Sequence, residues 1–180
     1  ILFLIVDKEA FAYDWKRFKA NFKNHIGQVF SGIVMVYLAL IIANIILQSL
    51  GVTGTSENEM VIQGLFSDDP IQLVLLFLLL CVFTPITEEI IFRKVLYNYV
   101  APRTGDTIAI IISGAVFGLM HVITYGDFIQ AIPYVFMGMI FGYIYFRSRR
   151  NIYVTIGVHF LNNLISYLIY VLMVFGIYTF

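Results

Sequence analysis

The chain has 180 residues, and its composition excludes a soluble globular domain. Hydrophobic residues make up 61% of it, charged residues 12%, and the mean hydropathy is +0.90, whereas soluble domains are about 45–50% apolar and about 25% charged. The net charge of zero excludes the basic surface of a nucleic-acid-binding protein, and the lone cysteine excludes an internal disulfide framework. We therefore predict an all-α fold, a polytopic bundle of transmembrane helices.

The predicted elements begin with the end of a span at residues 1–6. Residues 7–25 place aromatic side chains at helical spacing with Lys and Arg between them, as expected of an amphipathic helix that lies among lipid headgroups. Residues 26–50 are long and apolar enough to cross a membrane. Residues 51–70 are predicted to be a polar loop. This divides the chain into an interfacial region, 1–25, and a transmembrane catalytic domain, 26–180.

The next predicted span, residues 71–100, is longer than a membrane requires. As one helix it would measure about 45 Å, against a hydrocarbon core of about 30 Å, so we expect it to tilt or to kink at Pro85. A short turn is predicted at 102–106. Further spans are expected at 107–125, 128–146 and 152–180, which gives about six spans in all.

The charged residues predict the orientation. All eleven Lys and Arg residues lie on or near alternate connections, within 8–23, 93–103 and 147–150. The opposite connections, 51–70 and 126–127, contain five acidic residues and no basic one. By the positive-inside rule, the segments expected to face the cytoplasm are 7–25, 101–106 and 147–150. The membrane is expected to be that of a bacterial cell.

Ionisable and amide side chains inside spans are costly, so they are candidates for function. They fall on three predicted helices: Glu88, Glu89 and Arg93 on one, His121 on the next, and His159, Asn162 and Asn163 on the last. At about 1.5 Å of rise per residue from the cytoplasmic ends, four of these side chains reach one layer about 10 Å thick: Glu88, His121, His159 and Asn163. We therefore predict that they meet inside the membrane.

Helical geometry suggests how these side chains divide the chemistry. Glu88 and Glu89 are about 100° apart around the helix, so they cannot face the same point. Glu89 is four residues before Arg93, which favours an ion pair and leaves Glu88 as a general base that faces a histidine. Two alternatives remain for the histidines. His159 and Asn163 could donate to one oxyanion, or two histidines and a glutamate could ligate zinc, although the HExxH spacing is absent.

Three motifs carry a resemblance to a known family. They are EExxxR at residues 88–93, FxxxH at 117–121 and HxxxN at 159–163, in this order on three separate spans. The chain resembles the CPBP family, the CAAX-protease and bacteriocin-processing (Abi) membrane proteins, which include the type II CAAX prenyl protease of eukaryotes. The resemblance covers about residues 71–170 and implies an all-helical intramembrane endopeptidase.

The resemblance also implies roles for seven residues. In the family, the first glutamate and the FxxxH histidine are taken to activate water, and the HxxxN pair is taken to stabilise the oxyanion. The implied catalytic residues are Glu88, His121, His159 and Asn163, and the implied supporting residues are Glu89, Arg93 and Phe117. No cofactor is favoured. Because the family was long regarded as metal-dependent, zinc is the alternative, with Glu88, His121 and His159 as its ligands.

The expected partners are a membrane-associated peptide or protein substrate and the lipid bilayer, with no nucleic acid. The resemblance implies peptide-precursor maturation or bacteriocin immunity, and we expect water and substrate to enter a polar cavity from the cytoplasmic side. Two alternatives stay open. One is a non-proteolytic scaffold that binds a membrane protein partner, although its motifs would be degenerate and here they are intact. The other is a transporter, which the few spans and the lack of an inverted repeat disfavour.

Overall fold

The computed structural model describes residues 8–178, and every regular element in this range is helical. Four of these helices are long and apolar enough to cross a membrane: Phe22–Ser49, Pro70–Thr104, Phe128–Arg147 and Ile152–Val174. The helix Asp106–Val122 is apolar but shorter. The predicted all-α membrane protein is therefore confirmed. The predicted number of six spans is not, because the described residues contain four helices of sufficient length and one shorter apolar helix. The span predicted at residues 1–6 lies outside the described residues.

The N-terminal part of the structure is two long helices followed by a short one. Helix α2 (Lys8–Ala20) leads into α3 (Phe22–Ser49), and α4 (Glu57–Gln63) lies within the segment predicted to be a loop. Helix α4 is stabilised at its N-terminus by a cap, because the Ser56 hydroxyl accepts a hydrogen bond from the backbone N–H of Glu59. Two acidic residues in the first turn also favour the helix.

The long span changes its helical pitch along its length. It consists of α5 (Pro70–Leu76), the π-helical η1 (Phe77–Phe83), α6 (Thr84–Glu89), the π-helical η2 (Ile90–Tyr97) and α7 (Asn98–Thr104). Pro85, the predicted kink, lies in the first turn of α6, directly after η1. The wider π turn accommodates a residue that has no N–H to donate. The helix ends at Gly105, whose φ of +88° suits glycine, so the turn is shorter than predicted.

Three more helices complete the bundle: α8 (Asp106–Val122), α9 (Ala131–Arg147), preceded by the 3₁₀ turn η3 (Phe128–Gln130), and α10 (Ile152–Val174). Helices α8 and α9 approach closely at glycines. A Cβ on Gly118 would lie 2.6 Å from the backbone nitrogen of Val135, and one on Gly114 would lie 2.7 Å from that of Met139. Such contact requires residues without a side chain, as in other packed membrane helices.

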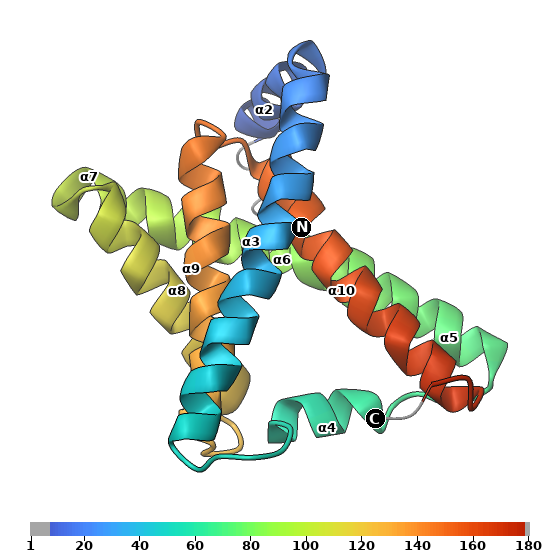
Figure 1. Cartoon of the computed structure of the whole chain (residues 1–180). Coiled ribbons are helices and arrows are strands. Elements are labelled where there is room, and N and C mark those ends of the chain that lie inside the picture. Colours follow the sequence, from blue (N-terminus) through green and yellow to red (C-terminus); the bar gives the residue numbers. More distant parts are fainter. Residues whose placement is uncertain (1–7, 179–180) are drawn as a thin grey trace.

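Figure 1 shows the helices in two groups that diverge. Helices α3, α8 and α9 lie on one side, and α5 lies beside α10 on the other. Helix α2, the end of α7 and the turn between α9 and α10 share one end of the molecule, while α4 lies between the two groups at the opposite end. All the basic connections therefore occupy the same end, as the charge pattern predicts.

Helix α2 has one face buried in the bundle and one face exposed, and its predicted place among lipid headgroups stays a prediction. Phe11 and Phe18 are buried against the bundle, whereas Trp15 and Phe22 are 45% and 55% exposed. Asp14, for which we predicted no role, is 3% exposed. One face of this helix is therefore part of the folded core, and only the other face is available to lipid.

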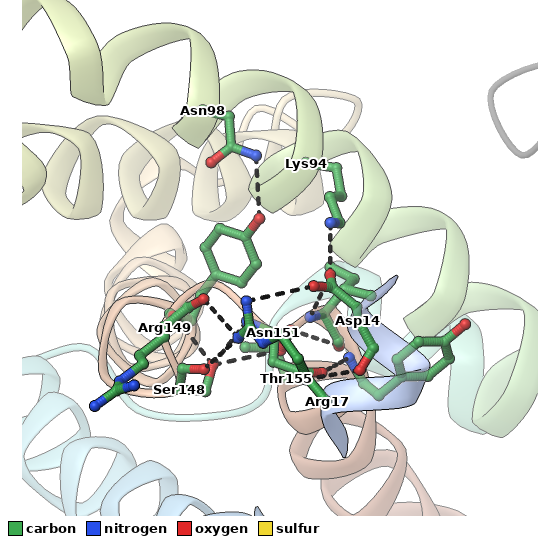
Figure 2. Close-up of polar contacts among 11 residues, drawn as sticks. Asp14, Arg17, Lys94, Asn98, Ser148, Arg149, Asn151 and Thr155 are labelled. Carbon is green, nitrogen blue, oxygen red and sulfur yellow. Dashed lines mark hydrogen bonds and ion pairs between the residues drawn. The ribbon is translucent and has the colours of Figure 1, made fainter. Parts of the chain in front are cut away.

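A buried polar cluster fastens α2 to the bundle (Figure 2). One carboxylate oxygen of Asp14 accepts hydrogen bonds from Lys94 Nζ at 2.6 Å and from the backbone N–H of Ile152 at 3.3 Å. The Asn151 side chain donates to the Asp14 backbone carbonyl at 2.9 Å. Arg17 donates to the carbonyl of Ser148, at the C-terminal end of α9, at 3.1 Å. We call this set the Asp14 cluster; it joins α2 to the long span, to the end of α9 and to the start of α10.

Candidate active site

A cavity of about 490 Å³ lies between the two groups of helices. Its walls come from α4, the long span, α8, α9 and α10. The four residues predicted to be catalytic all line it: Glu88, His121, His159 and Asn163. The structure thus brings together four polar side chains that the sequence places on three separate helices.

The predicted ion pair is present beside the cavity. Glu89 Oε2 accepts a hydrogen bond from Arg93 Nε at 3.0 Å, and both side chains are fully buried. Arg93 also donates to the hydroxyl of Ser113 on α8 at 3.1 Å. These contacts pair the buried charge of Arg93, as a buried charge requires, while its Nη2 has no hydrogen-bond partner among the described residues.

Glu89 makes a second contact that the sequence interpretation missed. Its other oxygen, Oε1, lies 3.1 Å from His159 Nδ1. A carboxylate that already accepts from Arg93 accepts here too, so Nδ1 of the histidine carries the donated hydrogen. The opposite ring nitrogen, Nε2, is then directed towards Glu88, whose Oε2 lies 3.7 Å away. His159 therefore stands between the two glutamates, and the ion pair fixes its orientation.

Glu88 is the least satisfied carboxylate of the site. Its Oε2 is buried and has no hydrogen-bond partner among the described residues, and 3.7 Å to His159 Nε2 is too long for a hydrogen bond. Its side chain remains 23% exposed, and the residue lines the cavity. Glu88 was predicted to face a histidine, and His159 is the histidine whose Nε2 lies 3.7 Å from it. An unpaired carboxylate oxygen at this place is suited to accept a proton from a water in the cavity.

The first motif histidine, His121, is held by the last turns of α8. Its Nδ1 lies 2.8 Å from the Phe117 carbonyl oxygen, which only accepts, so Nδ1 carries a hydrogen and Nε2 keeps its lone pair in the neutral ring. The ring stacks on Tyr134, with centroids 4.6 Å apart and planes 16° apart. Phe117 is fully buried, and its ring centroid also lies 4.6 Å from that of His121, which agrees with the predicted packing position.

Asn163 is fixed by contacts on both sides of its amide. Its Nδ2 donates to the backbone carbonyl of Leu80 at 2.8 Å, and its Oδ1 accepts from the side chain of Asn162 at 3.1 Å. Leu80 belongs to the π-helical η1, so an irregular turn of the long span supplies this anchor. A carboxamide nitrogen has two hydrogens, and one of them remains for a group in the cavity.

The far side of the cavity is formed by residues that the sequence analysis did not identify. Asn58 and Glu59 of α4 line it together with Tyr134 and Tyr170. The Tyr134 hydroxyl is hydrogen-bonded to Ser56, and the Tyr170 hydroxyl donates to Glu59. Burial raises the pKa of Glu59. The only sequence signal was the acidic composition of 51–70, which is also typical of a solvated loop.

The cavity extends from Glu88 towards α4, at the end of the molecule opposite the basic connections (Figure 1). The expected entrance lay at the basic end. At that end, the Asp14 cluster packs α2 against the long span and α10. The lining residues therefore reach the acidic end, and the route by which water and substrate enter the cavity stays a prediction.

The side chains expected to ligate zinc are not arranged as a metal site. Within residues 8–178, no three His, Cys, Asp or Glu side chains are placed so that they could hold a metal ion. Both histidines use Nδ1 for partners within the protein, His121 for the Phe117 carbonyl and His159 for Glu89, and this leaves Nε2 of each ring free. Such contacts are compatible with a metal ligand as well as with a hydrogen-bonding role. Whether the site uses a metal stays a prediction, and we derive no chemical step through a metal.

Known proteins are similar to part of this chain. The family profile described as type II CAAX prenyl endopeptidase Rce1-like matches residues 70–165. The "Putative membrane peptidase YdiL" of Bacillus subtilis (strain 168) is 32% identical over 113 residues, which are 63% of this chain and 43% of that protein. An "Uncharacterized protein" of Mycoplasma capricolum subsp. capricolum is 33% identical over 120 residues, 63% of this chain and 34% of its own.

This chain thus spans less than half the length of these two relatives. No solved structure matches it significantly. The region matched by the family profile contains all three motifs, from Glu88 to Asn163. It also contains most of the cavity lining and the buried ion pair. This chain belongs to the type II CAAX prenyl endopeptidase Rce1-like family.

Proposed function

We propose that this chain is the catalytic region of a membrane-embedded endopeptidase that hydrolyses a peptide bond with water activated by Glu88. The observation that carries the proposal is the buried, unpaired Oε2 of Glu88, which lines a cavity shared with His121, His159 and Asn163. Membership of a family of prenyl endopeptidases supports it independently. The relative described as a membrane peptidase agrees with it.

The first step is proton removal from water. Glu88 accepts the proton through its unpaired oxygen, and the neutral ring of His121 accepts a hydrogen bond from the same water through Nε2, which orients it. The resulting hydroxide forms a bond to the carbon of the scissile carbonyl. The π electrons of the carbonyl bond move to its oxygen, which becomes an oxyanion. The low-polarity walls of the cavity strengthen each of these interactions.

The second step is stabilisation of that oxyanion. Asn163 supplies its free amide hydrogen, since its other contacts to Leu80 and Asn162 hold the carboxamide in place. His159 supplies Nε2–H when its ring is protonated, and Glu89 balances the added charge through Nδ1. The peptide C–N bond then breaks, and the proton held by Glu88 passes to the leaving amine. The products are a carboxylic acid and an amine, and Glu88 is again a carboxylate.

In this proposal Glu89 and Arg93 act through His159. Neither residue lines the cavity. The Arg93 guanidinium keeps Glu89 ionised and in place, and Glu89 keeps His159 in the tautomer and rotamer that direct Nε2 to the cavity. They are positioning residues of the same kind as the carboxylates that orient histidines in other hydrolases.

The substrate that we propose is a membrane-associated peptide or protein, and peptide-precursor maturation or bacteriocin immunity would each supply one. Cleavage next to a prenylated cysteine is the activity in the family's description, and it is a second substrate to test. A scaffold without proteolytic activity would have no need of an oriented histidine beside an unpaired carboxylate. We therefore favour the enzyme.

The test uses the full-length protein in lipid nanodiscs and a library of fluorescence-quenched peptides. We expect cleavage by the wild type and a loss of at least about 100-fold in Glu88→Gln, because a general base of this kind contributes about 10²–10⁴-fold. Glu57→Gln is the matched control, since Glu57 is exposed on α4 and does not line the cavity. Full activity in Glu88→Gln would disprove the proposal.

Metal dependence is tested on the same sample. We expect a metal content well below one ion per chain and cleavage that survives dialysis against a chelator. Cleavage that is lost on dialysis and restored by zinc would instead favour ligand roles for the two histidines and Glu88.

A further inference from the structure

The charged groups of the cavity are of one sign. Among the lining residues that the structure describes are two carboxylates, Glu59 and Glu88, and no Lys or Arg. The connections at this end of the molecule, 51–70 and 126–127, likewise contain five acidic residues and no basic one. The buried guanidinium of Arg93 lies outside the lining and is paired with Glu89. A ligand in the cavity therefore meets a carboxylate at both ends and no Lys or Arg side chain.

Glu59 differs from Asp14 and Glu89, the two fully buried acids, in its partners. Asp14 contacts Lys94, and Glu89 contacts Arg93. In the described part of the chain, Glu59 takes part in no ion pair, and its carboxylate accepts one side-chain hydrogen bond, from Tyr170. A carboxylate in a low-polarity place without a cation carries a desolvation cost that its surroundings do not offset. A cation brought by a ligand would offset it.

The position of Glu59 relates it to the reacting atoms. The cavity lining runs without interruption from Glu88 and His159, deep in the bundle, to Asn58, Glu59 and Tyr170 at α4. A peptide whose scissile carbonyl faces Glu88 would extend its neighbouring residues along this lining. One of its side chains would then lie against α4, where Glu59 is the single charged group that lines the cavity.

We propose that Glu59 is a specificity-determining residue that selects peptides with a Lys or Arg side chain close to the scissile bond. This inference rests on the proposed function and names the substrate class of the same site. The Glu59 carboxylate receives the cation, and the apolar stem of the Lys or Arg side chain packs on Ile62 and Tyr170, which line the cavity beside it. A peptide with Glu at this position meets the like charge of the Glu59 carboxylate and binds less tightly.

The experiment compares peptides that differ at one position. Quenched decapeptides with Lys, norleucine, Gln or Glu at each site around the cleaved bond are added to the full-length protein in nanodiscs, and kcat and KM are measured separately. We expect the Lys peptide to exceed the Glu peptide in kcat/KM by about tenfold or more, with most of the difference in KM, because the contact lies away from the reacting atoms. Glu59→Gln should abolish this preference, and Glu59→Lys should reverse it.

Two controls separate the possible causes. Glu57→Gln removes the same charge from the exposed side of the same helix and should leave the preference unchanged. Binding of the same peptides to Glu88→Gln is measured by fluorescence anisotropy, so that recognition is followed without cleavage. An equal change in Glu57→Gln, or equal binding of Lys and Glu peptides by Glu88→Gln, would overturn the inference about Glu59.

The two proposals fail in different ways. Full cleavage by Glu88→Gln with an intact Lys preference would disprove the mechanism and leave the role of Glu59 standing. Inactivation by Glu88→Gln without any Lys preference in the wild type would support the mechanism and disprove the role of Glu59.

Discussion

Two buried polar clusters lie at different depths of this bundle, and they differ in how completely their acidic groups are satisfied. In the Asp14 cluster, the carboxylate contacts Lys94 and a backbone N–H, and Arg17 lies 3.8 Å away. In the cavity, Glu88 has a buried oxygen without any partner in the described residues. Both clusters hold acids and bases from several helices, but only the second leaves a reactive atom beside an open volume.

This difference separates a structural cluster from a catalytic one. A carboxylate that is paired and hydrogen-bonded is stabilised in its ionised form and is therefore a weak base. An unsatisfied one costs stability and is retained where it has a use, as strained or unpaired groups at active sites generally are. Glu89 combines the two cases, because Arg93 satisfies it and it in turn orients His159. Variants of each cluster should therefore differ in whether they affect folding or activity.

The largest effect is expected at Glu89, which both pairs with a buried charge and orients a catalytic side chain. Glu89→Ala should lower both stability and activity, because it leaves the Arg93 guanidinium buried without its partner, at a cost of about 3–5 kcal/mol. Thermal unfolding in detergent and peptide cleavage would measure the two effects. The double variant Glu89→Ala with Arg93→Met should recover stability but not activity, since His159 still lacks its hydrogen-bond partner. Recovery of both would contradict the positioning role.

Glu88→Gln should affect activity alone. Its melting temperature should equal or exceed that of the wild type, since an unpaired buried carboxylate is removed, while cleavage falls by at least about 100-fold. Paired unfolding and cleavage assays on one preparation check this. A melting temperature lowered as much as in Glu89→Ala would place Glu88 among the structural groups.

Asp14→Asn should affect stability alone. The substitution removes the charge that pairs with Lys94, and it should cost about 1–3 kcal/mol, because the Lys94 side chain is only 9% exposed. Unfolding measured by circular dichroism tests this, and the cleavage rate per folded molecule should stay within about twofold of the wild type. A large loss of kcat in a fully folded sample would show that α2 participates in the reaction.

The smallest effect is expected from Tyr134→Phe. The ring that stacks on His121 remains, while the hydroxyl contact with Ser56 is lost, at a cost of about 1 kcal/mol. We expect a drop in kcat of a few-fold, and a larger one in Tyr134→Leu, which removes the ring as well. Equal rates in the two variants would show that stacking does not hold His121.

The sequence was sufficient to predict the features that depend on local spacing. Glu89 and Arg93 are four residues apart on one helix, so their ion pair follows from helical geometry. The shared layer of Glu88, His121, His159 and Asn163 follows from counting residues between charged connections. The roles of these residues stay predictions, since the geometry is compatible with them and activity has not been measured.

Contacts between distant segments could not be predicted in this way. Glu89 and His159 are 70 positions apart, and nothing in their spacing indicates that Glu89 would use its second oxygen for this histidine. Glu59 and Tyr170 are 111 positions apart. Helix α4 lies in a polar segment that was predicted to be a loop, and its N-terminus is capped by a single serine. Asp14 lies among basic residues, so its pattern is that of a solvated helix, although packing buries it.

The π-helical η1 has a consequence for sequence comparison and for protein engineering. A π turn contains one residue more than an α turn would need, so deletion of one residue within Phe77–Phe83 would restore a regular helix. Every side chain before that point would then rotate by about 100° relative to Glu88. The span would keep its hydropathy and nearly its length, so it would still insert in a membrane-insertion assay. Alignments that close this one-residue gap would pair the motif with the wrong face of the helix.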